Sequence, residues 1–293
     1  METSSDDEGD TGSSLLTKTF FLLLFILPLS VYKSSPKIQS LSTAVANQQT
    51  ETPKPVKPVI TKAKNKKKKL YITFDDGPNK GTKNVLHIVQ DERVAVSFFI
   101  VGEHVFASPT QARLWDSLKM AKQIDLCNHS YSHAHSRYES YYQQPDSVVK
   151  DFKRTQDSLN LDNSIARTPG RNIWRIDTLQ FTDLKRSTAA ADSLQKAGFK
   201  LMGWDLEWHF DHKTMCVVTT AENMVAQIDS VFKHNRTKAK DHLVLLAHDQ
   251  AYVKSEDSFQ LRQFFQLLKQ RDYELTLVRD YPGANTSDSL IIK

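Results

Sequence analysis

Cysteine is scarce in this sequence of 293 residues, which has only Cys127 and Cys216. A small domain held by disulfides needs several paired cysteines, and a cysteine-based zinc site needs closely spaced pairs. Both classes of protein are therefore excluded. One bridge between the two stays open if the compartment is oxidising, but we expect both to pack as small apolar side chains.

A long apolar run is also missing. The run from Thr19 to Tyr32 has fourteen largely apolar residues, whereas a membrane-spanning helix needs roughly 20. It follows an acidic, serine-rich start and suits the apolar region of a secretory signal. We expect residues 1–33 to act as a cleaved signal or as an uncleaved membrane anchor. The protein would then work outside the cytoplasm, in the periplasm or at the cell surface.

Basic residues are not spread out as they are in a nucleic-acid-binding domain. The formal net charge is +5, but six of the eight residues from Lys62 to Lys69 are lysine, with no aromatic residue among them. Residues 34–66 are rich in lysine and proline and lack an apolar period, which predicts a disordered linker. We expect no nucleic-acid partner. Adhesion of the lysine run to an anionic wall or membrane is the alternative to a solvated linker.

Short apolar runs alternate with helical patterns from Leu70 onward. Such repeated units imply parallel strands joined by crossover helices, so we expect residues 67–293 to form one α/β domain of barrel type. The predicted strands cover 70–74, 94–101, 124–127, 199–204, 243–247 and 275–278. The predicted helices cover 83–90, 112–122, 147–159, 182–197, 221–233 and 259–270.

Reactive side chains follow four of these predicted strands directly. In a parallel barrel the carboxyl ends of the strands face one mouth, so residues far apart in sequence would meet in one cavity. The residues concerned are Asp75, Asp76, His129, His133, Asp205, Glu207, His248 and Asp249.

Two of these groups suggest a metal centre. His129 and His133 are four residues apart, and residues four apart share one face of a helical turn. Two histidines and one carboxylate leave a position for water on Zn²⁺, as a catalytic site requires, and Asp76 is the best third ligand. Asp75 and Asp76 repel each other unless a metal or an arginine compensates. The alternative for Asp-Asp-Gly-Pro alone is a simple turn.

Five short segments follow one another in a recognisable order. They are Thr-Phe-Asp-Asp-Gly-Pro (73–78), His-Ser-Tyr-Ser-His (129–133), Arg-Thr-Pro (167–169), Asp-Leu-Glu-Trp (205–208) and Leu-Ala-His (246–248). With these segments the sequence resembles the polysaccharide deacetylases (carbohydrate esterase family four) over residues 68–280. The resemblance implies a distorted (β/α) barrel with fewer than eight regular strands. It also implies a metal-dependent hydrolase that removes acetyl groups, from nitrogen rather than oxygen, from a cell-wall or extracellular polysaccharide.

The same resemblance implies a role for each matching residue. Asp75 would be the general base, and Arg167 would pair with it and keep it ionised; the alternative for Arg167 is a surface arginine. His248 would be the general acid that protonates the leaving group. The ligands of Zn²⁺ or a similar divalent ion would be Asp76, His129 and His133.

The third motif departs from the family pattern. Gly170 follows Pro169 where the family has an aromatic residue, but glycine keeps the backbone N–H that would bind the substrate oxygen. Arg171 and Trp174 are candidates to fill part of the space. Because this motif is altered, a catalytically impaired barrel that only binds glycans is the alternative function.

The fourth motif has two acids, either of which could orient His248. We expect Asp205 rather than Glu207 to do so. Trp208 would form an apolar wall for the acetyl methyl group, although an ordinary core tryptophan is the alternative. The sequence does not identify the polysaccharide.

Overall fold

The computed structural model describes residues 67–285. The predicted signal or anchor at 1–33 and the predicted linker at 34–66 lie outside the described residues, so both stay predictions. Within residues 67–285, no helix combines the length and the apolar character that crossing a bilayer requires. Cys127 is buried, Cys216 is partly exposed, and neither forms a disulfide.

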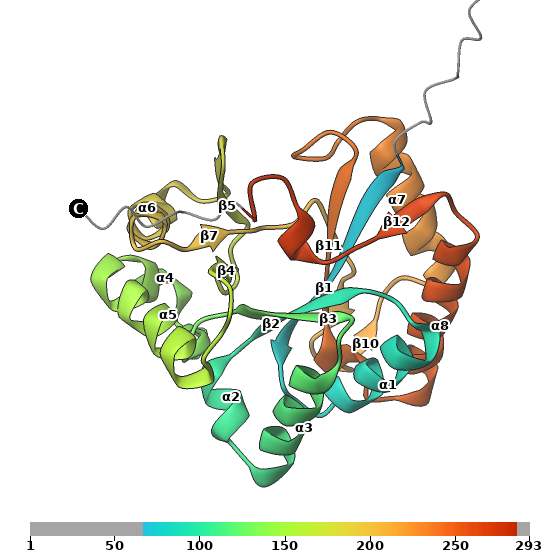
Figure 1. The fold of residues 1–293 in the computed structure, drawn as a ribbon, viewed down its shortest axis with the longest axis horizontal. Helices are drawn as coiled ribbons and strands as arrows, with labels where there is room; N and C mark the ends of the chain where they lie inside the picture. Colours follow the sequence, from blue (N-terminus) through green and yellow to red (C-terminus); the bar gives the residue numbers. More distant parts are fainter. Residues whose placement is uncertain (1–66, 286–293) are drawn as a thin grey trace, which may run out of the picture. The chain divides into compact units, whose positions relative to one another are not determined.

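Ten strands of the described chain form one mixed sheet, in the order β6-β5-β7-β4-β3-β2-β1-β11-β8, with β12 beside β1 (Figure 1). The run from β7 through β4 to β11 and β8 is parallel, and the β5–β6 hairpin is antiparallel. The strands are β1 (Lys68–Gly77), β2 (Val96–Ile100), β3 (Ile124–Asn128), β4 (Ile165–Ala166), β5 (Ile173–Ile176), β6 (Leu179–Thr182), β7 (Lys200–Leu201), β8 (Leu206–Glu207), β11 (His242–His248) and β12 (Tyr273–Leu275). A separate short hairpin pairs β9 (Phe210–Asp211) with β10 (Cys216–Val217).

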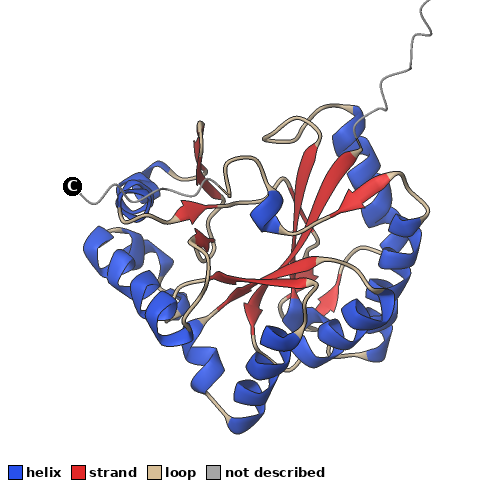
Figure 2. Cartoon of the chain, viewed as in Figure 1, coloured by secondary structure: helices blue, strands red, loops and turns tan. Residues whose placement is uncertain are grey.

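Helices lie outside the strands, as a β-then-α order requires (Figure 2). They are α1 (Thr82–Glu92), α2 (Gly102–Phe106), α3 (Pro109–Met120), α4 (Tyr138–Tyr142), α5 (Pro145–Leu159), α6 (Thr188–Lys196), α7 (Ala221–Lys233) and α8 (Ser255–Lys269). The predicted fold class, a distorted α/β barrel, is confirmed. Its parallel strands differ widely in length, with ten residues in β1 and two each in β4, β7 and β8.

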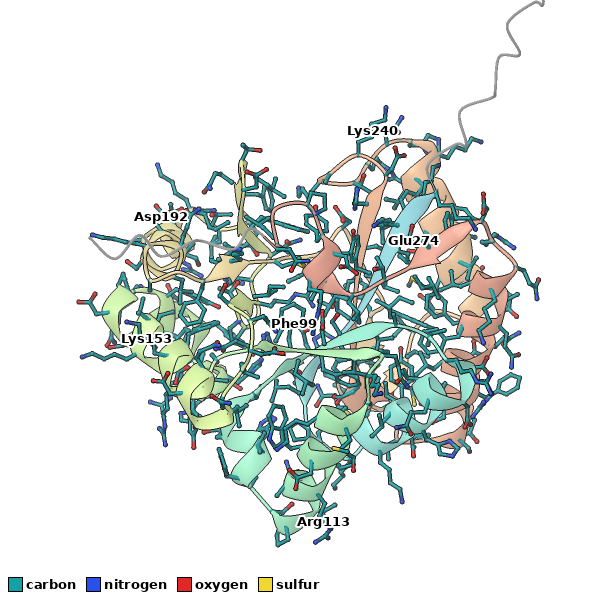
Figure 3. All side chains as sticks on the ribbon, viewed as in Figure 1. Phe99, Arg113, Lys153, Asp192, Lys240 and Glu274 are labelled. Carbon is teal, nitrogen blue, oxygen red and sulfur yellow. The ribbon has the colours of Figure 1, made fainter. Side chains whose placement is uncertain are left out.

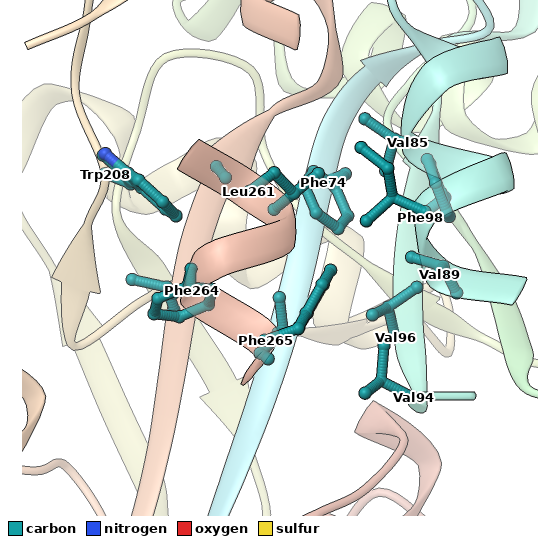
Figure 4. Packing of buried hydrophobic residues seen from close by; sticks show 14 of the residues in the cluster. Phe74, Val85, Val89, Val94, Val96, Phe98, Trp208, Leu261, Phe264 and Phe265 are labelled. Atoms are coloured by element: carbon teal, nitrogen blue, oxygen red, sulfur yellow. The ribbon is translucent and has the colours of Figure 1, made fainter. Parts of the chain in front are cut away.

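The main core lies between β1, β2, β11 and the helices α1, α7 and α8. Phe74, Phe98 and Phe264 are fully buried there, and Trp208 packs among them (Figure 4). Phe99 lies at the centre of the domain, while charged side chains such as Lys153 lie at its periphery (Figure 3). Removing this apolar surface from water is the main term that favours folding.

One predicted helix is wrong in its first part. Residues 182–197 were expected to be helical throughout, but the chain first completes the β5–β6 hairpin and α6 begins only at Thr188. Arg175 accounts for the difference. Its guanidinium donates to Phe181 O at 2.9 Å, to Thr182 Oγ1 at 3.0 Å and to Asp192 Oδ1 at 2.8 Å. These tertiary contacts outweigh the local helical pattern.

Candidate active site

Strand pairing brings the two ends of the domain sequence to one cavity. In the register of β1 and β11, Asp75 lies directly opposite His248. Consecutive residues of a strand normally point to opposite faces. Here the β1–β2 register shifts after Asp75, and Asp76 has a positive φ of 73°. Both carboxylates consequently line the same cavity.

Asp76, His129 and His133 form a compact group in this cavity. Their ligand atoms all lie within 4.8 Å of one another. Asp76 Oδ1 is 3.1 Å from His133 Nε2 and 3.4 Å from His129 Nε2. This oxygen is buried and accepts no hydrogen bond from the described residues. One carboxylate and two imidazoles around a buried, unsatisfied oxygen fit a Zn²⁺-type ion.

The two histidines do not share a helical face, which corrects the expectation from their spacing. His129 directly follows β3, and its Nδ1 lies 2.9 Å from Arg167 O. That carbonyl can only accept, so Nδ1 carries the proton and Nε2 is left to face Asp76. His133 opens a turn in which residues 133–136 all have positive φ. This left-handed turn, rather than a helix, directs the second imidazole towards the first.

The pKa shifts in this group reflect the same proximity. Burial alone would raise the pKa of Asp76, but the imidazoles of His129 and His133 outweigh it and hold the pKa well below its usual value. Burial alone would lower the pKa of His129, but the carboxylates of Asp75 and Asp76 raise it. The carboxylates thus favour the charged form of His129, and the imidazoles favour the charged form of Asp76.

Asp75 is paired with a fully buried arginine. Arg167 Nη1 lies 2.8 Å from Asp75 Oδ1, which excludes the alternative of a surface arginine. Its other donors reach Met202 O at 3.0 Å and Gly203 O at 2.9 Å, and its guanidinium lies 4.0 Å from the centre of the Phe99 ring. A buried cation that is satisfied in this way can compensate the charge of the neighbouring carboxylate.

Known proteins share this sequence pattern and fold. A family model described as polysaccharide deacetylase matches residues 62–190. A peptidoglycan-N-acetylglucosamine deacetylase of Bacillus cereus is 23% identical over 217 residues, covering 74% of this chain and 89% of that protein. A chitin disaccharide deacetylase of Vibrio alginolyticus is 21% identical, covering 72% and 71%. The structure of a CE4 esterase from Streptococcus mutans superposes with a TM-score of 0.52 at 25% identity, covering 73% and 87%.

The sequence and the fold of the domain are thus similar to those of the polysaccharide deacetylase family. The resemblance inferred from the five motifs is thereby confirmed. The cavity has a volume of about 550 Å³, and Asp75, Asp76, His129, His133 and His248 all line it.

The contact expected between Asp205 and His248 is not formed. Asp205 Oδ1 accepts from Lys238 N at 2.6 Å and Oδ2 accepts from Val244 N at 2.8 Å. Both oxygens are therefore occupied by backbone donors, one in the loop before β11 and one within β11, and Asp205 does not line the cavity. Glu207 does line the cavity, but its Oε1 lies 3.2 Å from His209 Nδ1. His248 Nδ1 is buried and makes no hydrogen bond with the described residues.

Trp208 does not form a wall of the cavity, so its predicted substrate contact is wrong. Its ring is 1% exposed and packs against Tyr252 and Phe264, and its Nε1 donates to Thr219 O at 2.9 Å. It is a core tryptophan. The aromatic residues that do line the cavity from this segment are Trp204 and Phe210.

Gly170 lines the cavity, and a tyrosine from another element covers it. A Cβ added to Gly170 would lie 3.2–3.4 Å from three atoms of the Tyr138 ring. Neither Arg171 nor Trp174 fills this space. Arg171 Nη1 folds back onto Gly170 O, and Trp174 is fully buried with its Nε1 donating to Asn172 Oδ1. The sequence pattern gives no signal for Tyr138, because this residue is distant from Gly170 in sequence and lies beside it only in the folded protein.

Several further cavity residues were missed by the sequence analysis. His104, His209 and His212 are not among the candidates of the sequence analysis, yet all three line the cavity. Gln250 was not singled out, although it follows His248 by only two residues. Proximity in sequence to a predicted strand end is the signal that could have identified Gln250.

Proposed function

We propose that this chain is a metal-dependent hydrolase that removes N-acetyl groups from an extracytoplasmic polysaccharide. The observation that carries the proposal is the convergence of three elements in one open cavity: a group that can hold a metal ion, an Arg-paired carboxylate, and an imidazole. Two of the relatives named above are a peptidoglycan-N-acetylglucosamine deacetylase and a chitin disaccharide deacetylase, and their names favour an amide substrate for this chain.

The residues of the cavity fit the two proton transfers of amide hydrolysis. Asp76, His129 and His133 would hold the divalent ion, most readily Zn²⁺. A bound ion of this kind acidifies water and polarises a carbonyl. Asp75, paired with Arg167, accepts the proton of the attacking water.

His248 then donates a proton to the leaving nitrogen as the C–N bond breaks, which yields a free amine and acetate. Gly170 would offer its backbone N–H to the acetyl oxygen as negative charge develops there. Trp204 and Phe210 supply the apolar part of the cavity wall, beside the position where the acetyl group would lie.

The test separates metal binding from proton transfer. Purified parent and Asp75→Asn proteins are compared for zinc content and for acetate release from N-acetylated and O-acetylated glycans. We expect one ion per chain in both proteins, and a loss of acetate release of 10²-fold or more in the variant, the usual cost of removing a general base. Asp116→Asn, at an exposed position of α3, is the matched control.

Loss of the ion in Asp75→Asn would contradict the assigned roles. A parent protein that binds glycans but releases no acetate would instead support the non-catalytic alternative. Greater release from O-acetylated than from N-acetylated glycans would overturn the proposed amide preference.

We also propose that the apolar run at residues 19–32 directs the domain across a membrane or anchors it there. The test is fractionation of cells that express the full chain or a chain lacking residues 1–33. The proposal predicts that the full chain is extracytoplasmic and the truncated chain is cytoplasmic. Cytoplasmic location of the full chain would overturn it.

A further inference from the structure

Gln250 contacts the carboxylate of the presumed metal ligand Asp76. It lies in the 3₁₀ turn Asp249–Tyr252, directly after β11, and its side chain lines the cavity. Gln250 Nε2 lies 3.2 Å from Asp76 Oδ2. An ionised carboxylate can only accept hydrogen bonds, so the amide nitrogen rather than the amide oxygen must face it.

The two oxygens of Asp76 therefore have different partners. Oδ1 faces the Nε2 atoms of His129 and His133, whereas Oδ2 accepts from Gln250. A carboxylate rotates about its Cβ–Cγ bond, and that rotation would exchange or tilt the two oxygens. Fixing Oδ2 is sufficient to keep Oδ1 pointed at the imidazoles.

Other contacts fix the backbone of Asp76 but leave this rotation free. The carbonyl of Asp76 lies 2.8 Å from His104 Nδ1 and accepts from Asn79 Nδ2 at 3.4 Å. Buried Asp249 holds the following turn through Asn79 Nδ2 and Thr82 Oγ1. None of these contacts touches the carboxylate of Asp76.

We infer that Gln250 is a positioning residue that presents Asp76 Oδ1 to the metal ion and thereby raises metal affinity. The inference rests on the metal centre of the proposed function. The equivalent support for His129 comes from the carbonyl of Arg167. Partners of this kind that orient a ligand typically change metal affinity 10–100-fold.

The experiment measures zinc affinity of the full chain by competition with a chromophoric chelator. Gln250→Met keeps the length of the side chain and removes the donor. We expect it to weaken zinc binding about 10–100-fold, with an unchanged melting temperature of the metal-free protein. Gln195→Met, at an exposed position of α6, makes the same chemical change away from the cavity and should leave affinity within twofold.

A double variant shows whether Gln250 acts through Asp76. In an Asp76→Ala background the partner of Gln250 is gone, so adding Gln250→Met should change the residual affinity less than twofold. An equal loss of zinc affinity in both backgrounds overturns the inference. An unchanged affinity in the single variant Gln250→Met overturns it too. So does a loss of affinity in Gln250→Met that comes with a lower melting temperature of the metal-free protein. A parent chain that binds no zinc would be a failure of the proposed function itself, and the same titration detects it.

Discussion

The two sides of the cavity differ in whether hydrogen bonds fix the orientation of their reactive side chains. On the metal side, Asp75 has Arg167, His129 has the carbonyl of Arg167, and Asp76 has Gln250. On the acid side, His248 Nδ1 makes no hydrogen bond with the described residues. The first side is therefore held in one arrangement by its own contacts, and the second is not.

The difference follows from the segments around each reactive side chain. On the metal side, Asp75 and Asp76 lie at the end of β1 and His129 follows β3, and the register of β1, β2 and β3 fixes their positions. On the acid side, His248 ends the seven-residue β11, but residues 204–212, from which Phe210 packs against it, contain only the two-residue strands β8 and β9. Short strands leave more of the geometry to loops, so this segment has more freedom to adjust to a substrate.

Breaking the pairing of the metal side should have the largest effect. Arg167→Met removes the buried cation and leaves the carboxylate of Asp75 without its partner. We expect a loss of about 3–5 kcal/mol in the free energy of unfolding, the typical cost of breaking a buried ion pair. Urea denaturation of the metal-free protein measures it. A loss below about 1 kcal/mol would mean that water already reaches this pair.

On the acid side, replacing Asp205 should affect stability rather than chemistry. Asp205→Asn keeps only one of the two oxygen acceptors used by Lys238 N and Val244 N. We therefore expect the free energy of unfolding to fall by about 1–3 kcal/mol. For the folded variant, the rate of acetate release per bound zinc should stay close to that of the parent. A rate loss of 100-fold or more with unchanged stability would restore Asp205 as the residue that orients His248.

The sequence was informative where one long strand fixes the outcome. The predicted strands end beside Asp75, His129 and His248, and their parallel pairing suffices to place these residues at one cavity mouth. Helix α7 matches its predicted bounds, Ala221–Lys233, because an apolar face and the capping Thr220 agree on them.

The sequence was uninformative where a tertiary contact decides. Asp205 and Glu207 differ by two residues, yet only Glu207 lines the cavity, because the backbone of β11 captures Asp205. Trp208 lies in the core because α8 supplies Phe264 as its partner. Neither partner is close in sequence, so no local pattern could distinguish a wall residue from a structural one.

The stability of the protein should also depend on pH through Asp205, which lies in the segment that closes the acid side. Burial raises the pKa of Asp205 from 3.8 to about 6, although backbone N–H groups oppose the shift. Between about pH 4 and pH 6 the folded chain thus holds a proton at this site that the unfolded chain has released. The stabilising contribution is complete below pH 4 and is lost as the pH rises through 6.

Urea unfolding of the metal-free parent and of Asp205→Asn at pH 4 to 7 measures this contribution, since the asparagine does not titrate. The stability of the parent relative to the variant should fall by about 2–3 kcal/mol across this range. A difference that stays constant with pH would indicate that Asp205 remains ionised in the folded protein.

The smallest effect is expected at Gly170, where the two sides meet. Gly170 has a φ of 62°, and an added Cβ would lie 3.2–3.4 Å from the Tyr138 ring. Gly198 also has a positive φ, of 94°, but an added Cβ there would meet nothing within 4 Å. Alanine at either position should lower the free energy of unfolding by about 1 kcal/mol, because its backbone is strained at a positive φ.

The excess cost of Gly170→Ala over Gly198→Ala then measures the contact with Tyr138, and we expect about 0.5 kcal/mol or more in thermal or urea unfolding. Replacing Tyr138 by alanine should abolish that excess, because the three described atoms nearest to the new methyl group all belong to this ring. An excess that survives Tyr138→Ala would show that Gly170 is constrained by its own backbone. In that case the tyrosine would cover the glycine without shaping this side of the cavity.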